Sequence, residues 1–269
     1  MRTERLRAWR GSSSERDGRP SGVPLPPARM PLLRGGRPLK RWRWVGAFSE
    51  DAMACAARVF VGGVPVTWWA VWDGAQLHER VHRRAGAVRM EPGHVTSAGL
   101  DLRFEEADGV EVVSPHGAQY IWTSKQGGIP IRGSVLGRPF EGHGFVDDTA
   151  GYHARRTAWL WSAGVGVAAS GALVAWNLVE GVHDDATVSE RTVWVDGSPH
   201  HLDPLPFAAD LSAVGELRCE AVAVRAHRER LLLFASEYEQ PFGRFSGSLP
   251  VAGPLREGWG VMERHSVRW

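Results

Sequence analysis

Residues 142–161 read GHGFVDDTAGYHARRTAWLW and lie at the junction of two β-rich halves of the chain. The stretch holds six ionisable side chains that could do chemistry. These side chains are His143, Asp147, Asp148, His153, Arg155 and Arg156. The junction is therefore the first candidate for a functional site. The fold of the protein follows from the patterns in the two halves on either side of it.

Both halves consist of short aromatic or β-branched runs that are separated by glycine-containing turns. Within 34–48, Trp42 and Trp44 alternate with Arg41 and Arg43, which is the period of two of a β-strand. Nothing before residue 140 has the period of a long amphipathic helix. Further strands are predicted at 54–62, 66–74, 77–84, 100–104, 110–113, 119–125, 129–136, 190–197, 217–227, 230–238 and 258–269.

The uncharged run 159–179 is long enough to cross a bilayer as a helix. Small and polar residues interrupt it, so a β-hairpin that turns near Ser170–Gly171 explains it better, and no stable transmembrane insertion is expected. The incoming strand then carries Trp159 and Trp161 on one face. The return strand carries three apolar side chains on one face, namely Val174, Trp176 and Leu178.

Changes in composition and the positions of turn residues divide the chain into three parts. Residues 1–29 are rich in Arg, Ser, Pro and Gly and lack an apolar period, so they are predicted to be disordered. They are either a start-site artefact, with translation beginning at Met30, or an organelle transit peptide. Residues 30–138 and 139–269 are expected to form an N-terminal and a C-terminal β-barrel. A faint internal repeat, WWAVWDG–HERVHRR against VAWNLVEG–SERTVWVDG, suggests duplication.

Charge and cysteine content limit the classes of function. Residues 1–44 hold twelve Lys and Arg against three acids, whereas the remainder is mildly acidic, which argues against a nucleic-acid-binding surface. The start has no apolar core of a secretory signal, so the protein is expected to be cytoplasmic. Cys55 and Cys219 are far apart and are interpreted as reduced thiols rather than a disulfide.

Several blocks together resemble one bacterial family. The blocks RGGRPLKRWRWVGAF, YIWTSKQGGIPIRG, VDDTAGYHARRTAWLWSAGVG, VAWNLVEGV, QPFGRFSGSLP and GVMERHSVRW look like the uncharacterised family called domain of unknown function 2804. The resemblance covers nearly everything from Met30 to Trp269. That family has no established activity, so the resemblance implies no function for this chain.

A more distant likeness concerns the junction. GHGFVDDTAG resembles the block G-x-x-W-x-D-H-x-W-G of the hydroxyneurosporene synthase or carotenoid hydratase group, whose members are built of two lipocalin-like (calycin-type) barrels. Gly142, Asp147 and Gly151 keep the register, and Phe145 stands for an aromatic residue. Asp148 replaces the His of the block. The likeness implies two calycin-type barrels or barrel-like sandwiches, and hydration chemistry as one activity.

Acid catalysis is one hypothesis for the junction. A hydratase, isomerase or cyclase of the carbocation type needs a carboxyl group that stays protonated, and burial raises a carboxyl pKa. Asp147 and Asp148 face opposite sides of a strand, so one of them enters a cavity. We assign the acid role to Asp147, with Asp148 as its neighbour and His153 as its proton partner. The candidate ligand-binding residues are Tyr152, Trp159, Trp161, Trp176, Glu180, Glu263 and His265. The alternative is that Asp147, Asp148 and Thr149 serve only to form a turn before a glycine.

The sequence leaves two principal functions open. The first is a binding module that holds a hydrophobic small molecule, such as a lipid or a terpenoid, in a Trp-lined barrel. The second is an enzyme that acts on an isoprenoid-like molecule. No cofactor is expected. A metal site of His143, Asp147 and His153 is a third hypothesis, although their spacing matches no ligand motif and no metal is assigned.

Overall fold

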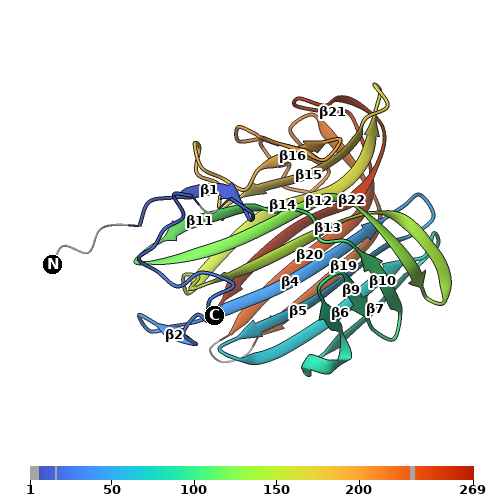
Figure 1. Ribbon diagram of the computed structural model, residues 1–269. Coiled ribbons are helices and arrows are strands. Elements are labelled where there is room, and N and C mark those ends of the chain that lie inside the picture. Colours follow the sequence, from blue (N-terminus) through green and yellow to red (C-terminus); the bar gives the residue numbers. More distant parts are fainter. Residues whose placement is uncertain (1–5, 16, 231–233) are drawn as a thin grey trace.

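The computed structural model describes residues 6–15, 17–230 and 234–269, and these form two large antiparallel sheets (Figure 1). In spatial order, the first sheet holds β7 (Leu77–His82), β6 (Val64–Trp72), β5 (Met53–Val61), β4 (Lys40–Phe48), β13 (Arg138–Gly151), β12 (Gln119–Val135), β10 (Leu100–Phe104), β9 (His94–Thr96) and β8 (Arg89–Glu91). Strand β11 (Val110–His116) pairs with β12 and with β1 (Trp9–Ser12).

In spatial order, the second sheet holds β17 (Ser198–His201), β16 (Thr192–Val195), β15 (Leu173–Glu180), β14 (Arg156–Ala168), β22 (Gly253–Arg268), β20 (Ala235–Ser246), β19 (Leu217–Arg230) and β18 (Ala213–Val214). Small additions are β21 (Ser248–Leu249), the hairpin β2 (Leu33–Arg34) and β3 (Arg37–Pro38), and the 3-10 turn η1 (Ala85–Ala87). The all-β prediction is confirmed. Part of the strand predicted at 230–238 falls on residues 231–233, which lie outside the described residues.

Both sheets follow one plan. A meander of four strands, β4 to β7 or β14 to β17, is followed by strands that return to the other side, and the last long strand pairs with the first. The repeat in the sequence aligned β6 and β7 with β15 and β16, whereas this plan aligns β5 and β6 with them. Among the described strands, β7 does not pair with β8, nor β17 with β18, so barrel closure is not detected in either unit.

The change of sheet occurs between Gly151, the last residue of β13, and Arg156, the first of β14. The predicted division at 138/139 would place β13 in the second unit, but β13 pairs with β12 along its length and with β4 from His143 to Gly151. The junction stretch therefore forms the last strand of one sheet and the first strand of the next. Whether the units are separate domains stays a prediction.

The hairpin predicted within 159–179 is confirmed. Strands β14 and β15 pair from Leu160–Glu180 to Val167–Leu173, and Gly171 takes a positive φ of 91° in the connecting turn. No helix in the described parts of the chain has the length and hydropathy that a membrane span requires.

The described part of the N-terminal segment is ordered, contrary to the disorder predicted for 1–29. Strand β1 pairs with β11, Leu25 is buried, and Tyr120 Oη donates to the Pro24 carbonyl over 2.6 Å. From β1, Arg10 reaches the second unit, where it donates to the Ser189 carbonyl over 2.5 Å. The segment finds its partners in tertiary contacts, which composition does not reveal. Residues 1–5 and 16 lie outside the described residues.

Removal of residues 1–29 should therefore lower the free energy of unfolding. The chain beginning at Met30 loses the β1 pairing and the burial of Leu25, which alone contributes about 2 kcal/mol. Urea denaturation of the full and shortened chains measures the difference. Equal midpoints would show that the contacts of this segment are energetically neutral.

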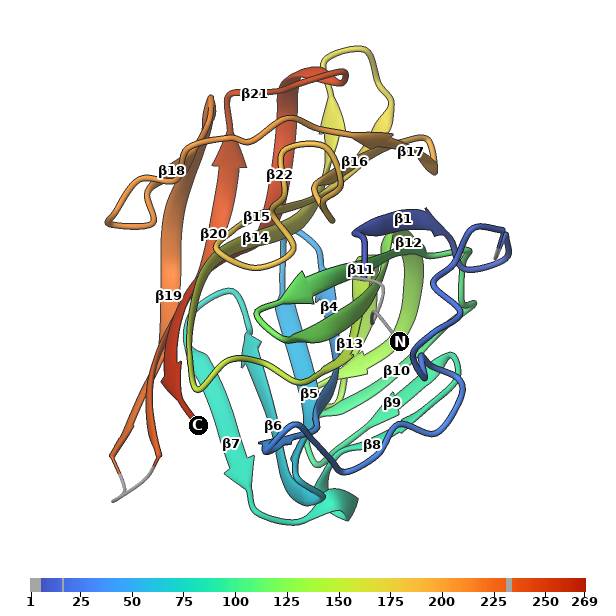
Figure 2. The same cartoon turned by 90° about the vertical axis from the view of Figure 1, so that its left-hand side faces the viewer.

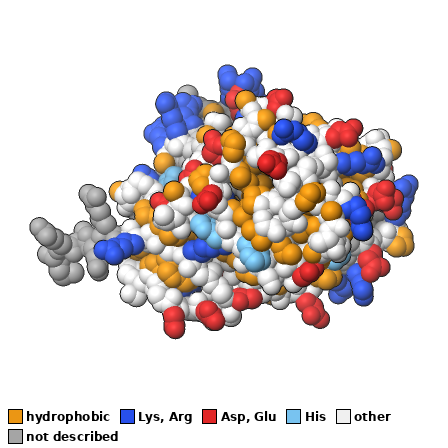
Figure 3. Space-filling view, turned by 90° about the horizontal axis from the view of Figure 1, so that it is seen from above, with side chains coloured by type: hydrophobic (Ala, Val, Ile, Leu, Met, Phe, Trp, Pro, Cys, Tyr) orange, Lys and Arg blue, Asp and Glu red, His pale blue; other side chains and the backbone are white. Residues whose placement is uncertain are grey.

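Four apolar clusters occur in the described chain. One lies on the outer face of the first sheet, meaning the face turned away from the second sheet, one lies on the corresponding outer face of the second sheet, and a smaller one includes Leu25, Tyr120 and Tyr152. The fourth cluster contains residues of both sheets, among them Trp44, Phe145, Trp161 and Val261. Figure 2 shows the backbone of the two sheets, and we call the side chains of this shared cluster, with the polar side chains beside them, the inter-sheet layer. On the face drawn in Figure 3, basic, acidic and apolar side chains are interspersed.

Candidate functional site

The inter-sheet layer contains a group of buried ionisable side chains. In the ladder between β12 and β13, Lys125 lies opposite Asp147, and its Nζ atom is 2.7 Å from Asp147 Oδ1. The same Nζ is 3.4 Å from Oε1 of Glu190, which precedes β16 in the second unit. Each of the three residues is at most 7% exposed. One lysine thus joins carboxylates from both halves of the chain.

The pKa shifts in this group follow from burial and charge. Burial lowers the pKa of Lys125, but Asp147 and Glu190 together outweigh it and raise that pKa above its usual value. Burial raises the pKa of Glu190, and Lys125 opposes this effect. Lys125 therefore stays charged, and Glu190 keeps its proton to a higher pH than a free carboxyl group does.

A second carboxyl group, that of Glu263 on β22, lies in the same layer. It accepts hydrogen bonds from Trp159 Nε1 at 2.8 Å, Tyr238 Oη at 2.9 Å and Gln240 Nε2 at 3.1 Å. Burial raises its pKa to about 7, and Asp147 adds to the increase. This carboxyl is therefore partly protonated at neutral pH.

Stacked tryptophans connect the two carboxyl groups. Trp42 Nε1 donates to Asp147 Oδ2 over 3.2 Å, and the Trp42 ring stacks on that of Trp159 with 6.2 Å between the centroids and 10° between the planes. Trp159 in turn donates to Glu263 and meets the His265 ring at 4.5 Å. The carboxyl groups of Asp147 and Glu263 are therefore lined by aromatic rings.

Buried histidines complete the layer. His153 is fully buried, and neither of its ring nitrogens makes a hydrogen bond of ordinary distance and angle to a described residue, although the Gly151 backbone interacts favourably with the charged form of the ring. Its ring lies 5.2 Å from that of Trp42 and 5.7 Å from that of His116. His183 Nδ1 is 2.8 Å from Ser114 Oγ, whereas its Nε2 has no partner within the described chain. Burial lowers the pKa of His153 and of His183 well below 6.5, so both rings are neutral.

The structure brings together part of the predicted site. Asp147, Trp159, Glu263 and His265 lie in the inter-sheet layer, as does Trp161, whose Nε1 donates to Asn177 Oδ1 over 2.7 Å. His265 Nε2 is 2.9 Å from Ser236 Oγ, and burial lowers its pKa to about 3.

His153 lies in this layer without bonding to Asp147. The recorded partners of the Asp147 carboxylate are Lys125, Trp42, Thr149 and Thr123, and no described hydrogen bond joins it to His153. A direct proton exchange between the two residues therefore has no geometric support. The acid role of Asp147 stays a prediction.

Four predicted site residues lie elsewhere. Asp148 faces the outer side of the first sheet, as its adjacency to Asp147 required, and pairs there with Arg43 at 2.5 Å. Burial raises the pKa of Asp148 to about 6, although Arg43 opposes this. Tyr152 donates to the Pro31 carbonyl over 2.8 Å in a separate apolar cluster.

The other two misplaced residues belong to β15. Trp176 lies in the outer core of the second sheet, where its Nε1 donates to Ser162 Oγ over 3.0 Å. Glu180, the last residue of β15, is exposed. Neither reaches the inter-sheet layer, because the hairpin register turns Trp176 away from it and strand β15 ends at Glu180.

Sequence reasoning missed Lys125, Glu190, Trp42, Tyr238 and Gln240 as members of the site. For Lys125 a signal existed, since it shares a strand face with Ile121 and Thr123, both fully buried. Glu190 follows an irregular segment, and no periodicity marks it.

The hypothesis of a metal site is not supported by the geometry. Within the described residues, no three His, Cys, Asp or Glu side chains are grouped so that they could hold a metal ion. His143 pairs with Phe48 near the far end of the β4–β13 ladder, away from the Gly151 end that leads to His153.

These features define an all-β protein of two large antiparallel sheets with a buried polar layer between them. Residues 76–269 match the family described as Domain of unknown function (DUF2804), and the chain belongs to that family. The resemblance seen in the sequence is thus confirmed, over a shorter span than Met30–Trp269. No curated protein matches the sequence.

Several solved structures resemble the fold weakly. A crystal structure named for AttH of Nitrosomonas europaea is 11% identical, with a TM-score of 0.41, and the match covers 90% of this chain and 98% of that one. Kievitone hydratase of Nectria haematococca is 9% identical, with a TM-score of 0.43 and coverages of 83% and 88%. CghA with Sch210972 is also 9% identical, with a TM-score of 0.39 and coverages of 86% and 88%.

Proposed function

We propose that the inter-sheet layer binds a largely apolar small molecule that carries a polar group. The observation that supports this proposal is the combination of tryptophan walls with buried polar atoms that lack partners. These atoms are Nδ1 and Nε2 of His153, Nε2 of His183 and Oε2 of Glu190, considered within the described chain. Most buried side-chain polar atoms in proteins are paired with protein groups or ordered water, so these four atoms need a ligand or water as an explanation.

The chemistry of the layer indicates the class of ligand. Flat indole faces of Trp42 and Trp159 favour an extended apolar or unsaturated skeleton. The neutral imidazole of His153 both donates and accepts, so it suits a hydroxyl or carbonyl group better than a charged one. An isoprenoid alcohol combines these features, and farnesol is a suitable probe.

Replacement of Trp159 by Phe should weaken farnesol binding about tenfold, because the stacked indole and its hydrogen bond to Glu263 are lost. Quenching of tryptophan fluorescence measures the affinity. The matched control is Trp122→Phe, which changes a buried tryptophan on the outer side of the first sheet whose Nε1 has no partner in the described chain. Equal affinities of the two variants, or no binding by the unmodified chain, would refute the proposal.

Native mass spectrometry provides a test that does not depend on the probe. The full chain is purified from a bacterial host, and its intact mass is recorded before and after extraction with organic solvent. A co-purifying apolar molecule that is absent from a Trp159→Phe preparation would support the proposal. The same molecule retained by both preparations would place its binding site elsewhere.

Acid catalysis is a second candidate function, and the raised pKa of Glu263 favours it. A carboxyl with a pKa of about 7 can deliver a proton to an alkene carbon, and the π electrons form the new C–H bond. Trp159 lies beside the carboxyl and can stabilise the resulting carbocation through its ring face. Water then adds its oxygen to the cation and returns a proton to Glu263.

Asp147, the acid expected from the sequence, is already an acceptor for Trp42 and Thr149 and a partner of Lys125. Incorporation of carbon-bound deuterium into farnesol or its hydration product in D₂O separates the roles of the two carboxyl groups. Glu263→Gln should abolish incorporation while farnesol still binds. If Asp147→Asn abolishes it and Glu263→Gln does not, the acid is Asp147. Without incorporation by the unmodified chain, catalysis on this probe fails while the binding proposal stands.

A further inference from the structure

The outer face of the second sheet carries a groove that the inter-sheet site does not use. On β22, Arg264, Ser266 and Arg268 alternate with Glu263 and His265, which face the inter-sheet layer. Two adjoining hollows of about 570 and 610 Å³ open along this outer face and share Glu237 and Ser266 in their lining. They span β14, β22, β20 and β19.

The lining of the groove has more positive than negative charge. Five arginines face three glutamates, and they are Arg156, Arg228, Arg230, Arg264, Arg268, Glu229, Glu237 and Glu239. Each of these glutamates forms an ion pair with an arginine other than Arg156 and Arg268. Glu237 pairs with Arg228 and Arg230, Glu239 pairs with Arg264, and Glu229 pairs with Arg83 from the first unit.

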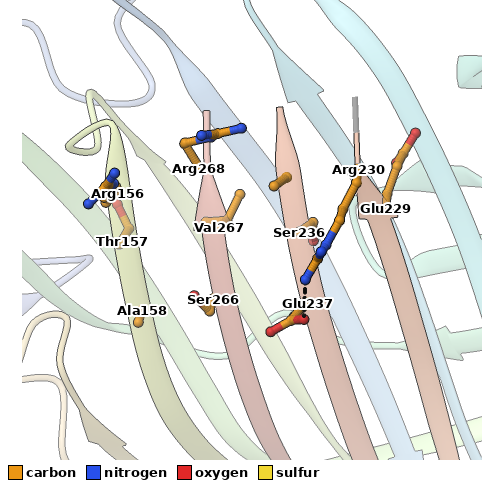
Figure 4. Close-up of a pocket in the computed structure, with 11 residues that line it drawn as sticks. Arg156, Thr157, Ala158, Glu229, Arg230, Ser236, Glu237, Ser266, Val267 and Arg268 are labelled. Atoms are coloured by element: carbon orange, nitrogen blue, oxygen red, sulfur yellow. Dashed lines mark hydrogen bonds and ion pairs between the residues drawn. The ribbon is translucent and has the colours of Figure 1, made fainter. Parts of the chain in front are cut away.

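Arg156 and Arg268 are left without an acidic partner among the described residues. They lie directly opposite each other in the β14–β22 ladder, and Arg230 lies at the same level across β20, because Ala235 pairs with both Arg268 and Arg230 (Figure 4). The Nε atom of Arg268 is buried and has no hydrogen-bond partner within the described chain. Like charges at directly opposed positions destabilise a sheet unless something compensates them.

We propose that Arg156 and Arg268 form an anion site for a phosphate group. Planar guanidinium groups bind phosphate oxygens with two parallel hydrogen bonds, and two guanidinium groups from neighbouring strands can hold one phosphate between them. Ser266, next to the pair on β22, supplies a hydroxyl donor in the same groove. The phosphate belongs either to a free anion or to a lipid headgroup, and both sources present the same oxygens.

The double variant Arg156→Gln/Arg268→Gln tests the proposal in the full chain. Calorimetric titration with inorganic phosphate should show binding near one equivalent, weakened at least tenfold in the double variant and also weakened by added salt. The matched control is Arg244→Gln, because Arg244 is an exposed arginine of β20 outside the groove lining. Without phosphate, the double variant should be at least as stable as the unmodified chain, since a like-charge pair has been removed.

Vesicles identify the source of the phosphate. Co-sedimentation with phosphatidylglycerol vesicles, but not with phosphatidylcholine vesicles, and its loss in the double variant would assign a lipid headgroup. Binding of inorganic phosphate without co-sedimentation would assign a free anion. The proposal is overturned if neither probe binds, or if the double variant and Arg244→Gln bind equally well.

Discussion

Replacement of Lys125 by methionine is expected to lower the free energy of unfolding by about 3–5 kcal/mol at pH 7. The lysine is the common counter-charge of Asp147 and Glu190, at 2.7 and 3.4 Å, and water does not reach either carboxyl freely. Its loss leaves uncompensated buried charge, which costs much more than the pair itself contributes. Urea denaturation at pH 7 measures the change.

Lys40 provides a matched control for this substitution. It is also buried, but its Nζ donates to the His153 carbonyl over 3.2 Å and lies 4.9 Å from the Trp269 ring, with no carboxylate partner in the described chain. Lys40→Met should therefore change the stability by only about 1 kcal/mol. Equal losses in the two variants would show that the removed packing, and not the uncompensated buried carboxylates, explains the effect.

Two further measurements isolate the charge effect. The destabilisation caused by Lys125→Met should shrink at pH 5, because Glu190, whose pKa is raised by burial, then holds a proton. The triple variant Lys125→Met/Asp147→Asn/Glu190→Gln should recover most of the lost stability, since a neutral group of similar volume can replace a buried ion pair. A triple variant as unstable as Lys125→Met would contradict the electrostatic account.

The faces of individual strands were predictable from the sequence, because side-chain alternation is a local property. It separated Trp42 from Arg43 and Asp147 from Asp148 correctly. It did not predict which face of the first sheet meets the second sheet. From the sequence alone, Lys125 therefore could not be distinguished from a lysine on a solvent-exposed face of a strand.

The misplaced and missed residues depend on longer-range geometry. In the β14–β15 ladder, Trp176 lies opposite Gly164, and Trp161 lies opposite Val179. This register puts the two tryptophans on opposite faces of the sheet, and the turn that sets it has no unique signature in the sequence. A Cβ atom at Gly164 would collide with the Trp176 ring, so this glycine is needed for the packing. Glu190 reaches Lys125 only because the two sheets pack together.

Replacement of Glu263 by glutamine is expected to make the stability of the protein less sensitive to alkaline pH. The pKa of Glu263 is raised from 4.5 to about 7 in the folded chain, so the folded state holds a proton that the unfolded state has released between these values. Its contribution to stability is fully present below pH 4.5 and is lost as the pH rises through 7. The loss amounts to about 3 kcal/mol for this fully buried group.

The histidines titrate in the opposite direction. His265, with a pKa of about 3, resists protonation in the folded chain, so its contribution is present above pH 6.5 and is lost as the pH falls. The pH profile of the unmodified chain therefore combines opposing slopes. The difference between Glu263→Gln and the unmodified chain removes the histidine contribution, because both proteins share it.

Urea denaturation between pH 5 and pH 8 provides that difference. The stability of Glu263→Gln relative to the unmodified chain should rise by about 2–3 kcal/mol over this range. Glu257→Gln, at a partly exposed position of the same strand that pairs only with Arg256 in the described chain, should show no such rise. A flat difference for Glu263→Gln would mean that the folded carboxyl is already charged at pH 5. It would then have no proton to give at neutral pH, and acid catalysis by Glu263 would fail while ligand binding between the sheets would remain open to test.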